Sequence, residues 1–531
     1  MRGSEPGGEA AAGGPVPGGA ANVRRVTSAV FWNFFGKTFV LGVRFAESVL
    51  LVRLLGREAY GLYGSLINLE AIAVMVISLG LENAISRFAP QLVAEGDAPK
   101  MKSLLKKVFG LRTLLLVPAG IALVAGGQLI SSTFYHGLLP PGFLRAVFVL
   151  VVIVSFHSLF RTFLDSFFHV KYISVVDAVT QGAYIAGAAG AVWLGLGLRG
   201  VFSALIIAQG GAAIALFLKF GFTLGAMPET GGKSRVAGRR VIGYSWSLYL
   251  FGILLYVLGK GLDVLLIGML TADLTQVAWY LIAFNLAYYS LSVMDIAVSA
   301  NFIVSLIVGA HTAGNTTLLR KIFTGLFEFI YVYCLPVAAG GLLLAPSIVR
   351  FAYGGENAGA AALMVVFIGA MTVGKLSSIT SYFLVVLDRE KTLVRARALF
   401  GLVNLAGALI LIPRWGALGA VAATSAVMVC ITGFEVWLVG RVLTPRYSLS
   451  FIGKSLAATL AMAAVIGIPG FLWNGPVGLK VPVLVAAGAV SYFWGIRKFR
   501  PFSPEVVDLL VKTDYPFRST ILKMLALGPP R

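Results

Sequence analysis

The stretch 143–167 reads FLRAVFVLVVIVSFHSLFRTFLDSF, and long apolar runs of this kind recur along the chain. A long apolar run leads into His157, Arg161 and Asp165, which follow one another at steps of four residues. A membrane-spanning helix needs roughly 20 predominantly apolar residues, and residues four apart share one helix face. The stretch therefore predicts a helix that crosses a membrane and carries polar side chains on one face.

The composition extends this prediction to the rest of the chain. Of 531 residues, 58% are hydrophobic and 12% are charged, whereas about 25% of the residues of a soluble domain are charged. In lipid, backbone groups must bond to one another, which leaves helices or closed barrels. The apolar runs are continuous and lack the alternation of barrel strands. We therefore predict an all-α, polytopic membrane helix bundle.

About fourteen transmembrane helices are predicted, in two pseudo-symmetric halves followed by two extra C-terminal helices. The expected spans are 28–52, 61–87, 104–130, 143–167, 173–195, 199–222, 244–270, 277–308, 318–345, 360–387, 391–412, 417–439, 450–473 and 479–496. The expected organisation is a disordered cytoplasmic tail (1–22), an N-terminal six-helix half (23–222), a basic cytoplasmic linker (223–242), a C-terminal six-helix half (243–440), two extra transmembrane helices (441–496) and a basic amphipathic cytoplasmic tail (497–531).

Charge sets the expected orientation and excludes several classes of function. The net charge of +21 comes largely from short loops and the C-terminal tail, as the positive-inside rule requires, so we do not expect a nucleic-acid partner. The basic loops predict a plasma-membrane protein with both termini in the cytoplasm. The sequence has no P-loop, no nucleophile elbow and no metal-ligand spacing. We therefore expect a protein that is not an enzyme and that has no cofactor and no metal site.

Ionisable residues inside the predicted spans are the candidate functional residues. Arg44 and Glu47 in the first span resemble Lys260 and Asp263 in the seventh, because each cation precedes an acid by three residues and an apolar triplet follows. A cation and an acid three residues apart lie on one helix face and can pair, and charges inside a membrane are costly and usually functional. The candidate cations of a central cavity are Lys37, Arg44, Arg161, Lys260 and Lys375, and the candidate charge partners or ion-coupling acids are Glu47, Asp165, Asp263 and Asp295. The alternative is that these residues form structural ion pairs between helices.

Four motifs carry a resemblance to a known family. They are LLVRLLGREAYGLYGSL (50–66), LGLENAISRF (79–88), VAWYLIAFNLA (277–287) and LVNLAGALILIPRWGALGAVAATS (402–425). In this order and spacing they resemble the polysaccharide (oligosaccharide-lipid) flippases, a branch of the multidrug/oligosaccharidyl-lipid/polysaccharide exporter superfamily. The resemblance covers residues of about 28 to 500.

The resemblance implies a function. Such proteins accept a polyprenyl-(pyro)phosphate-linked oligosaccharide at the cytoplasmic face and turn it to the outer face by alternating access. The implied partners are this substrate, membrane lipid, a coupling cation, and glycosyltransferases or a polymerase of the same pathway. The alternatives within the superfamily are a peptidoglycan lipid-precursor flippase and a cation-coupled multidrug exporter. A membrane-embedded polysaccharide polymerase or ligase is a remoter alternative, since the predicted outer loops are short.

Overall fold

The computed structural model describes most of the chain. The described residues are 20–95, 97–167, 169–227, 249, 252–253, 256, 258–297, 307–445, 447–473, 475–504 and 506–507. Within these ranges, the side chains of 20–37, 93–95, 134 and 294–297 are outside the description. The tail 1–22 and the linker 223–242 therefore lie largely outside the described residues, and most of the tail 497–531 does too.

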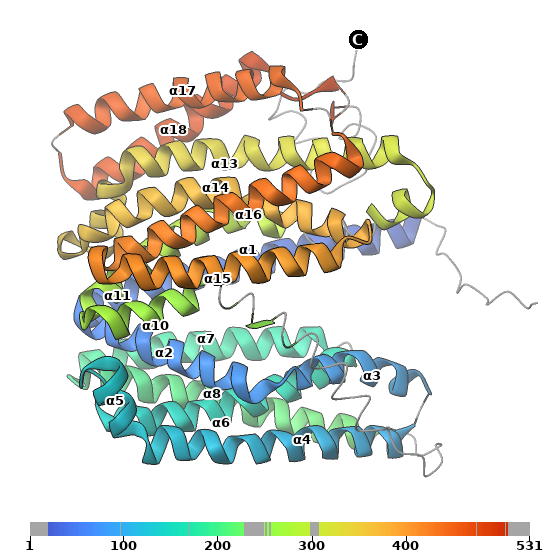
Figure 1. Cartoon of the computed structure of the whole chain (residues 1–531), viewed down its shortest axis with the longest axis vertical. Coiled ribbons are helices and arrows are strands. Elements are labelled where there is room, and N and C mark those ends of the chain that lie inside the picture. Colours follow the sequence, from blue (N-terminus) through green and yellow to red (C-terminus); the bar gives the residue numbers. More distant parts are fainter. Residues whose placement is uncertain are drawn as a thin grey trace, which may run out of the picture.

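The described part of the chain is built of helices that run back and forth across the bundle (Figure 1). The first are α1 (Ala20–Leu55), α2 (Arg57–Ser78), α3 (Leu81–Glu95), α4 (Ala98–Gly120), α5 (Gly127–Tyr135), α6 (Pro141–Ser166), α7 (Val170–Trp193) and α8 (Gly197–Gly225). The others are α10 (Lys260–Thr271), α11 (Leu274–Ala297), α13 (Thr316–Tyr353), α14 (Gly359–Val386), α15 (Glu390–Trp415), α16 (Ala417–Leu443), α17 (Leu449–Leu472) and α18 (Val477–Phe499). Short π and 3-10 turns lie at Ile121–Ala125 and Gly355–Asn357.

The length and apolar character of these helices confirm the predicted fold class. Among the described residues, 11 helices are long and apolar enough to cross a membrane. The chain is therefore a multi-pass helical membrane protein.

Two of the predicted spans are interrupted in the structure. The span 61–87 is divided between α2 and α3, because Leu79 and Gly80 have φ values of 42° and 70°. That left-handed conformation ends a helix, and glycine adopts it without steric cost. The span 104–130 consists of α4, the π turn and α5, with Pro118 just before the π turn. A proline removes one backbone hydrogen bond, so a change of helix geometry there is expected.

The helices pack in two groups, which lie one above the other in Figure 1. We call α2–α8 the first helix group, in which α6 contacts α2, α3 and α8. We call α10–α18 the second helix group, in which α14 contacts α11, α13 and α16. The two extra C-terminal helices, α17 and α18, pack on each other and on α13. The domain boundaries expected from the sequence stay predictions, because most of the linker between the groups is outside the described residues.

The two groups are in contact where α1 ends and α2 begins, and we call this the α1–α2 end of the bundle. Here α2 packs on α11, and α1 contacts α7, α11 and α13. The largest hydrophobic core contains residues of both groups, whereas a second core, from Leu81 to Met227, belongs to the first group alone. The groups therefore share a core near the α1–α2 end, and the first group has its own core toward the opposite end.

Glycines on α2 allow the closest contact between the groups. A Cβ atom on Gly61 would lie 1.9 Å from the backbone oxygen of Leu274, and one on Gly64 would lie 2.1 Å from a methyl carbon of Leu281. Polar contacts reinforce this end. Arg53 donates from Nε to the carbonyl of Ala352 at 2.7 Å. The α1–α2 end of the bundle is therefore tightly closed.

Candidate functional site

Three of the predicted charges meet at the junction of the two helix groups. Glu47 on α1 interacts electrostatically with Arg44 on the same helix and with Lys260 at the start of α10. Its Oε2 atom accepts a hydrogen bond from Nε2 of Gln181 on α7 at 2.5 Å. We call Arg44, Glu47, Lys260 and Gln181 the central charge cluster. It joins α1 to a helix of each group, so a relative movement of the groups would change it.

The two cations of this cluster are accessible. Arg44 and Lys260 are both exposed, although both belong to predicted spans. Within the described ranges, neither forms an ion pair with a carboxylate within 4.0 Å. An Arg guanidinium can bind a phosphate through two parallel hydrogen bonds, and a Lys ammonium binds it as a point charge. The cluster carries two cations and one acid, so its formal charge favours an anionic group.

Aromatic rings of α11 lie beside these cations. The Nζ atom of Lys260 lies 5.3 Å from the centre of the Phe284 ring, and Phe284 stacks on Tyr288 at 5.6 Å. Tyr289 contacts Phe45 of α1 edge-on at 6.1 Å. Tyr288 is exposed. Aromatic faces of this kind supply apolar contact area for a bound ligand, while the neighbouring charges supply orientation.

A layer of buried hydroxyl groups separates the cluster from the α1–α2 end. The hydroxyls of Tyr63 on α2 and Tyr184 on α7 lie 2.9 Å apart. The hydroxyl of Tyr60 accepts a hydrogen bond from Nδ2 of Asn285 on α11 at 3.3 Å. These bonds connect α2 to α7 in its own group and to α11 in the second helix group, so they help to hold the α1–α2 end closed.

Asp263 occupies a different environment from the one expected for it. It is fully buried, and its Oδ2 atom accepts hydrogen bonds from the hydroxyls of Tyr280 on α11 and Thr424 on α16, both at 2.6 Å. The expected pairing with Lys260 is absent, because Lys260 interacts with Arg44 and Glu47 instead. The physical reason is direction: Asp263 points into the second helix group, whereas Lys260 is exposed toward α1.

The surroundings of Asp263 are rich in oxygen. The Thr424 hydroxyl also lies 3.1 Å from Oδ1 of Asn404 on α15, and a single hydroxyl proton cannot be donated to both acceptors at once. The Oδ1 atom of Asp263 is buried without a hydrogen-bond partner. Carboxylate, amide and hydroxyl oxygens are ligands of hard cations. We call Asp263, Tyr280, Asn404 and Thr424 the Asp263 oxygen cluster.

Arg161 and Asp165 belong to a third polar group, inside the first helix group. The Nη1 atom of Arg161 lies 2.7 Å from Oδ1 of Asp177 on α7, and both side chains are half-exposed. Asp165 is exposed and interacts with Arg161 only electrostatically. Arg161 therefore has an acid partner on the neighbouring helix, and it is not part of the central charge cluster.

Of the other candidates, Lys375 is described and two are not. Lys375 is buried in α14, a helix that packs against α11, α13 and α16. The side chains of Lys37 and Asp295 lie outside the described residues. Their proposed roles stay predictions.

Two further ion pairs lie within single helix groups. Arg112 on α4 pairs with Glu82 on α3. Arg397 on α15 lies 3.1 Å from Glu435 on α16, and the Glu435 carboxylate also accepts a hydrogen bond from the hydroxyl of Ser377 at 2.6 Å. These pairs join neighbouring helices of one group and leave little charge exposed, which is the arrangement of a structural contact.

A comparison with protein families decides what kind of protein this is. A family model described as polysaccharide biosynthesis protein matches residues 50–362. The chain belongs to this family. The match confirms the resemblance drawn from the sequence motifs. No curated protein sequence matches the chain.

Two solved structures share the fold of this chain. The structure of the lipid II flippase MurJ in an inward closed conformation has a TM-score of 0.70 and 14% identity, over 90% of this chain and 98% of that chain. An inward-facing multidrug resistance MATE family transporter of the MOP superfamily has a TM-score of 0.61 and 12% identity, over 76% of this chain and 94% of that chain. At these identities the similarity establishes a shared fold.

Several residues of these sites were not singled out from the sequence. Asn404 and Thr424 lie in the stretch 402–425, one of the motifs that carry the family resemblance, so their position was a usable signal. Asp177, Gln181 and Tyr184 of α7 follow one another at steps of four and three residues. That spacing places them on one helix face, so a polar stripe along the fifth predicted span was a second signal.

Proposed function

We propose that this family member moves a polyprenyl-(pyro)phosphate-linked oligosaccharide from the cytoplasmic to the outer face of the plasma membrane by alternating access. One observation carries the proposal. Arg44 and Lys260 are exposed beside Glu47 at the junction of the two helix groups. A (pyro)phosphate would bind to these cations, and the rings of Phe284 and Tyr288 would support the neighbouring sugars. The lipid chain would remain in the bilayer.

The conformation is consistent with loading from the cytoplasm. The basic loops predict that the end opposite to the α1–α2 end lies in the cytoplasm, together with both chain termini. The tightly closed α1–α2 end would then face outward. A substrate made in the cytoplasm would reach the central charge cluster in this state, and opening of the α1–α2 end would release it outside.

The Asp263 oxygen cluster is the proposed site for a coupling cation. Among the candidate acids, Asp263 is surrounded by hydroxyl and amide oxygen atoms, and its own Oδ1 atom has no hydrogen-bond partner. A Na⁺ ion or a proton bound there would supply the missing partner. Glu47 is a second candidate, because its hydrogen bond with Gln181 joins α1 to the first helix group and would change when the two groups move. Asp165 and Asp295 remain candidates from the sequence.

The function is tested by measuring the pool of lipid-linked sugars in cells with and without this protein. Accumulation of one polyprenyl-linked oligosaccharide on the cytoplasmic face, relieved by the restored protein, is the expected result. An unchanged pool with altered drug sensitivity would favour a multidrug exporter. Accumulation of a peptidoglycan lipid precursor would instead favour a precursor flippase. Partnership with glycosyltransferases or a polymerase of the pathway is tested by co-purification.

The site is tested with Arg44→Ala and Lys260→Ala. Each should reduce transport while the protein still inserts, because the substrate phosphate loses a cation. Arg414→Ala is the matched control, since Arg414 is exposed at the end of α15 and is not part of the cluster. Normal transport by both cluster variants would refute the site. Loss of expression in both would favour structural ion pairs.

A further inference from the structure

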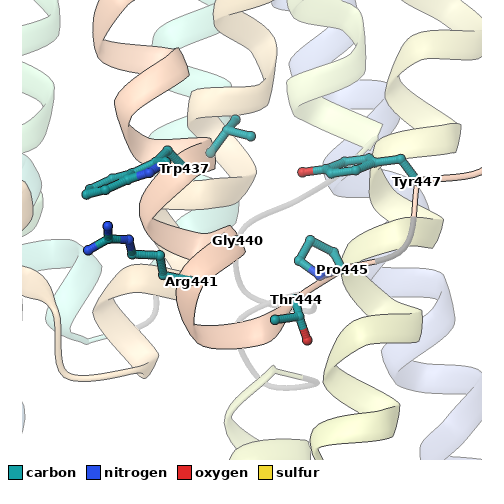
Figure 2. A pocket seen from close by; sticks show the side chains of 7 residues that line it. Trp437, Gly440, Arg441, Thr444, Pro445 and Tyr447 are labelled. Atoms are coloured by element: carbon teal, nitrogen blue, oxygen red, sulfur yellow. The ribbon is translucent and has the colours of Figure 1, made fainter.

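A pocket unrelated to the central charge cluster lies at the far end of α16 (Figure 2). Its volume is about 430 Å³. It is lined by the last turns of α16 and by the connection to α17, with the residues Val436, Trp437, Gly440, Arg441, Thr444, Pro445 and Tyr447. Figure 2 shows Trp437 and Arg441 on one flank and the Tyr447 ring on the other, with its hydroxyl directed toward α16. Gly440 lies between them.

The surroundings of the pocket are those of a membrane boundary. Trp437 is 49% exposed, and the neighbouring Val442 and Leu449 are 41% and 82% exposed. Apolar side chains exposed at the ends of membrane helices contact lipid, and Trp and Tyr concentrate where the hydrocarbon meets water. The pocket therefore opens toward the lipid of one leaflet, at the end of the bundle opposite to the α1–α2 end.

The charge at this pocket is positive. None of the described residues that line it is acidic. Arg441 is exposed, and its guanidinium lies 4.1 Å from the centre of the Trp437 ring. Among the described residues it has no ion pair with a carboxylate. A guanidinium stacked on a ring keeps its N–H groups free at the edge of the plane, where a phosphate can accept from two of them.

The C-terminal end of α16 does not bind the positive charge of Arg441. The last carbonyl of α16, on Leu443, accepts a hydrogen bond from Nε of Arg320 at 2.6 Å. Arg320 therefore satisfies a helix end that would otherwise attract Arg441. The Tyr447 ring is held against Phe327 of α13 at 5.2 Å. Both flanks of the pocket are thus fixed, while the guanidinium remains available.

We propose that this pocket binds one phospholipid with an anionic headgroup. The phosphate would bind to Arg441, and an acyl chain would lie on Val436 and Trp437. Charge complementarity and the lipid-facing position argue for this occupant. The opposite face of α16 carries Glu435 and Thr424, which belong to the buried contacts of the second helix group. The lipid would therefore bind outside the transport pathway and stabilise the contact between α16, α13 and α17.

Gly440 offers a direct way to close the pocket. A Cβ atom built on Gly440 meets nothing within 4 Å, so Gly440→Leu would fill the space without a clash at its Cβ. Gly433 on the same helix is also open at this distance and does not line the pocket. Gly433→Leu is therefore a matched control for the added side chain. Arg441→Gln removes the charge, and Arg441→Lys retains it.

The experiment measures lipid binding to the purified full-length protein by native mass spectrometry and by thermal unfolding in detergent. Added phosphatidylglycerol should bind and raise the melting temperature of the original protein, and phosphatidylcholine should do so more weakly. Apparent affinity for phosphatidylglycerol should fall about tenfold or more in Arg441→Gln, because a charge-assisted bond is lost. The affinity should fall comparably in Gly440→Leu. It should be unchanged in Gly433→Leu and only partly reduced in Arg441→Lys.

Three outcomes would overturn the proposal. Equal binding of the two phospholipids would remove the role of the headgroup charge. Unchanged phosphatidylglycerol binding in both Gly440→Leu and Arg441→Gln would place the lipid elsewhere. An equal rise in melting temperature with inorganic phosphate would show that the site takes a free anion and not a lipid. The unfolding of each variant without lipid separates a loss of the site from a loss of the fold.

Discussion

A single methyl group on Gly61 should open the α1–α2 end of the bundle. In Gly61→Ala the new Cβ would lie 1.9 Å from the backbone oxygen of Leu274 and 2.8 Å from its carbonyl carbon. Because these are backbone atoms of α11, the clash can be relieved only by moving α2 away from α11. Gly64→Ala meets a methyl group of Leu281 at 2.1 Å, which can rotate away. Gly61→Ala should therefore have the larger effect.

The magnitude follows from the cost of overpacking. An extra methyl group in a tightly packed site costs about 1–3 kcal/mol. That cost falls on the closed conformer alone, so the ratio of closed to open molecules should decrease about 5- to 150-fold. The open conformer is unaffected, because the two helices are then apart. Gly110→Ala is the control, since its Cβ would meet nothing within 4 Å.

The measurement is the rate at which a buried cysteine at the α1–α2 end reacts with a membrane-impermeant maleimide. Ala278 on α11 is fully buried there, and Ala278→Cys serves as the reporter after both native cysteines are replaced. When opening is fast compared with labelling, the rate follows the open population. The rate should rise by the same factor in Gly61→Ala. Labelling as slow as in Gly110→Ala would refute the closed-end assignment.

Three further outcomes are expected. Na⁺ should raise the melting temperature of the purified protein above its value in choline, and Asp263→Asn should abolish that rise; a Na⁺ response that Asp263→Asn leaves unchanged would place the cation elsewhere. Glu435→Leu should destabilise the protein by about 3–5 kcal/mol, because the buried ion pair between Arg397 and Glu435 is broken. Adding Arg397→Met should restore most of the melting temperature, and no recovery would contradict this reason. Arg161→Gln should change stability by less than about 1 kcal/mol in chemical denaturation, because that pair is half-exposed; a larger loss would show that the pair is a structural lock.

The fold class and the family were predictable from the amino-acid sequence alone, and both predictions are confirmed. Hydropathy is a local property, so a run such as 143–167 identifies a spanning helix whatever it packs against. The family motifs are also local, and 50–66 and 277–287 lie within the residues that the family model matches. The sequence analysis predicted one continuous span over 61–87 and missed the interruption at Leu79, because a left-handed residue other than glycine has no clear sequence signature.

Which charged side chains meet depends on how the helices pack. Glu47 and Lys260 are far apart in the chain, and the electrostatic interaction between them exists because α1 lies between the two helix groups. Spacing along one helix predicted that Lys260 would pair with Asp263, yet residues three apart differ by about 60° around the helix axis. That angle is enough to send Asp263 to Thr424 and to leave Lys260 exposed. The period of a helix fixes the relative directions of its side chains, but packing alone fixes which neighbour each one faces.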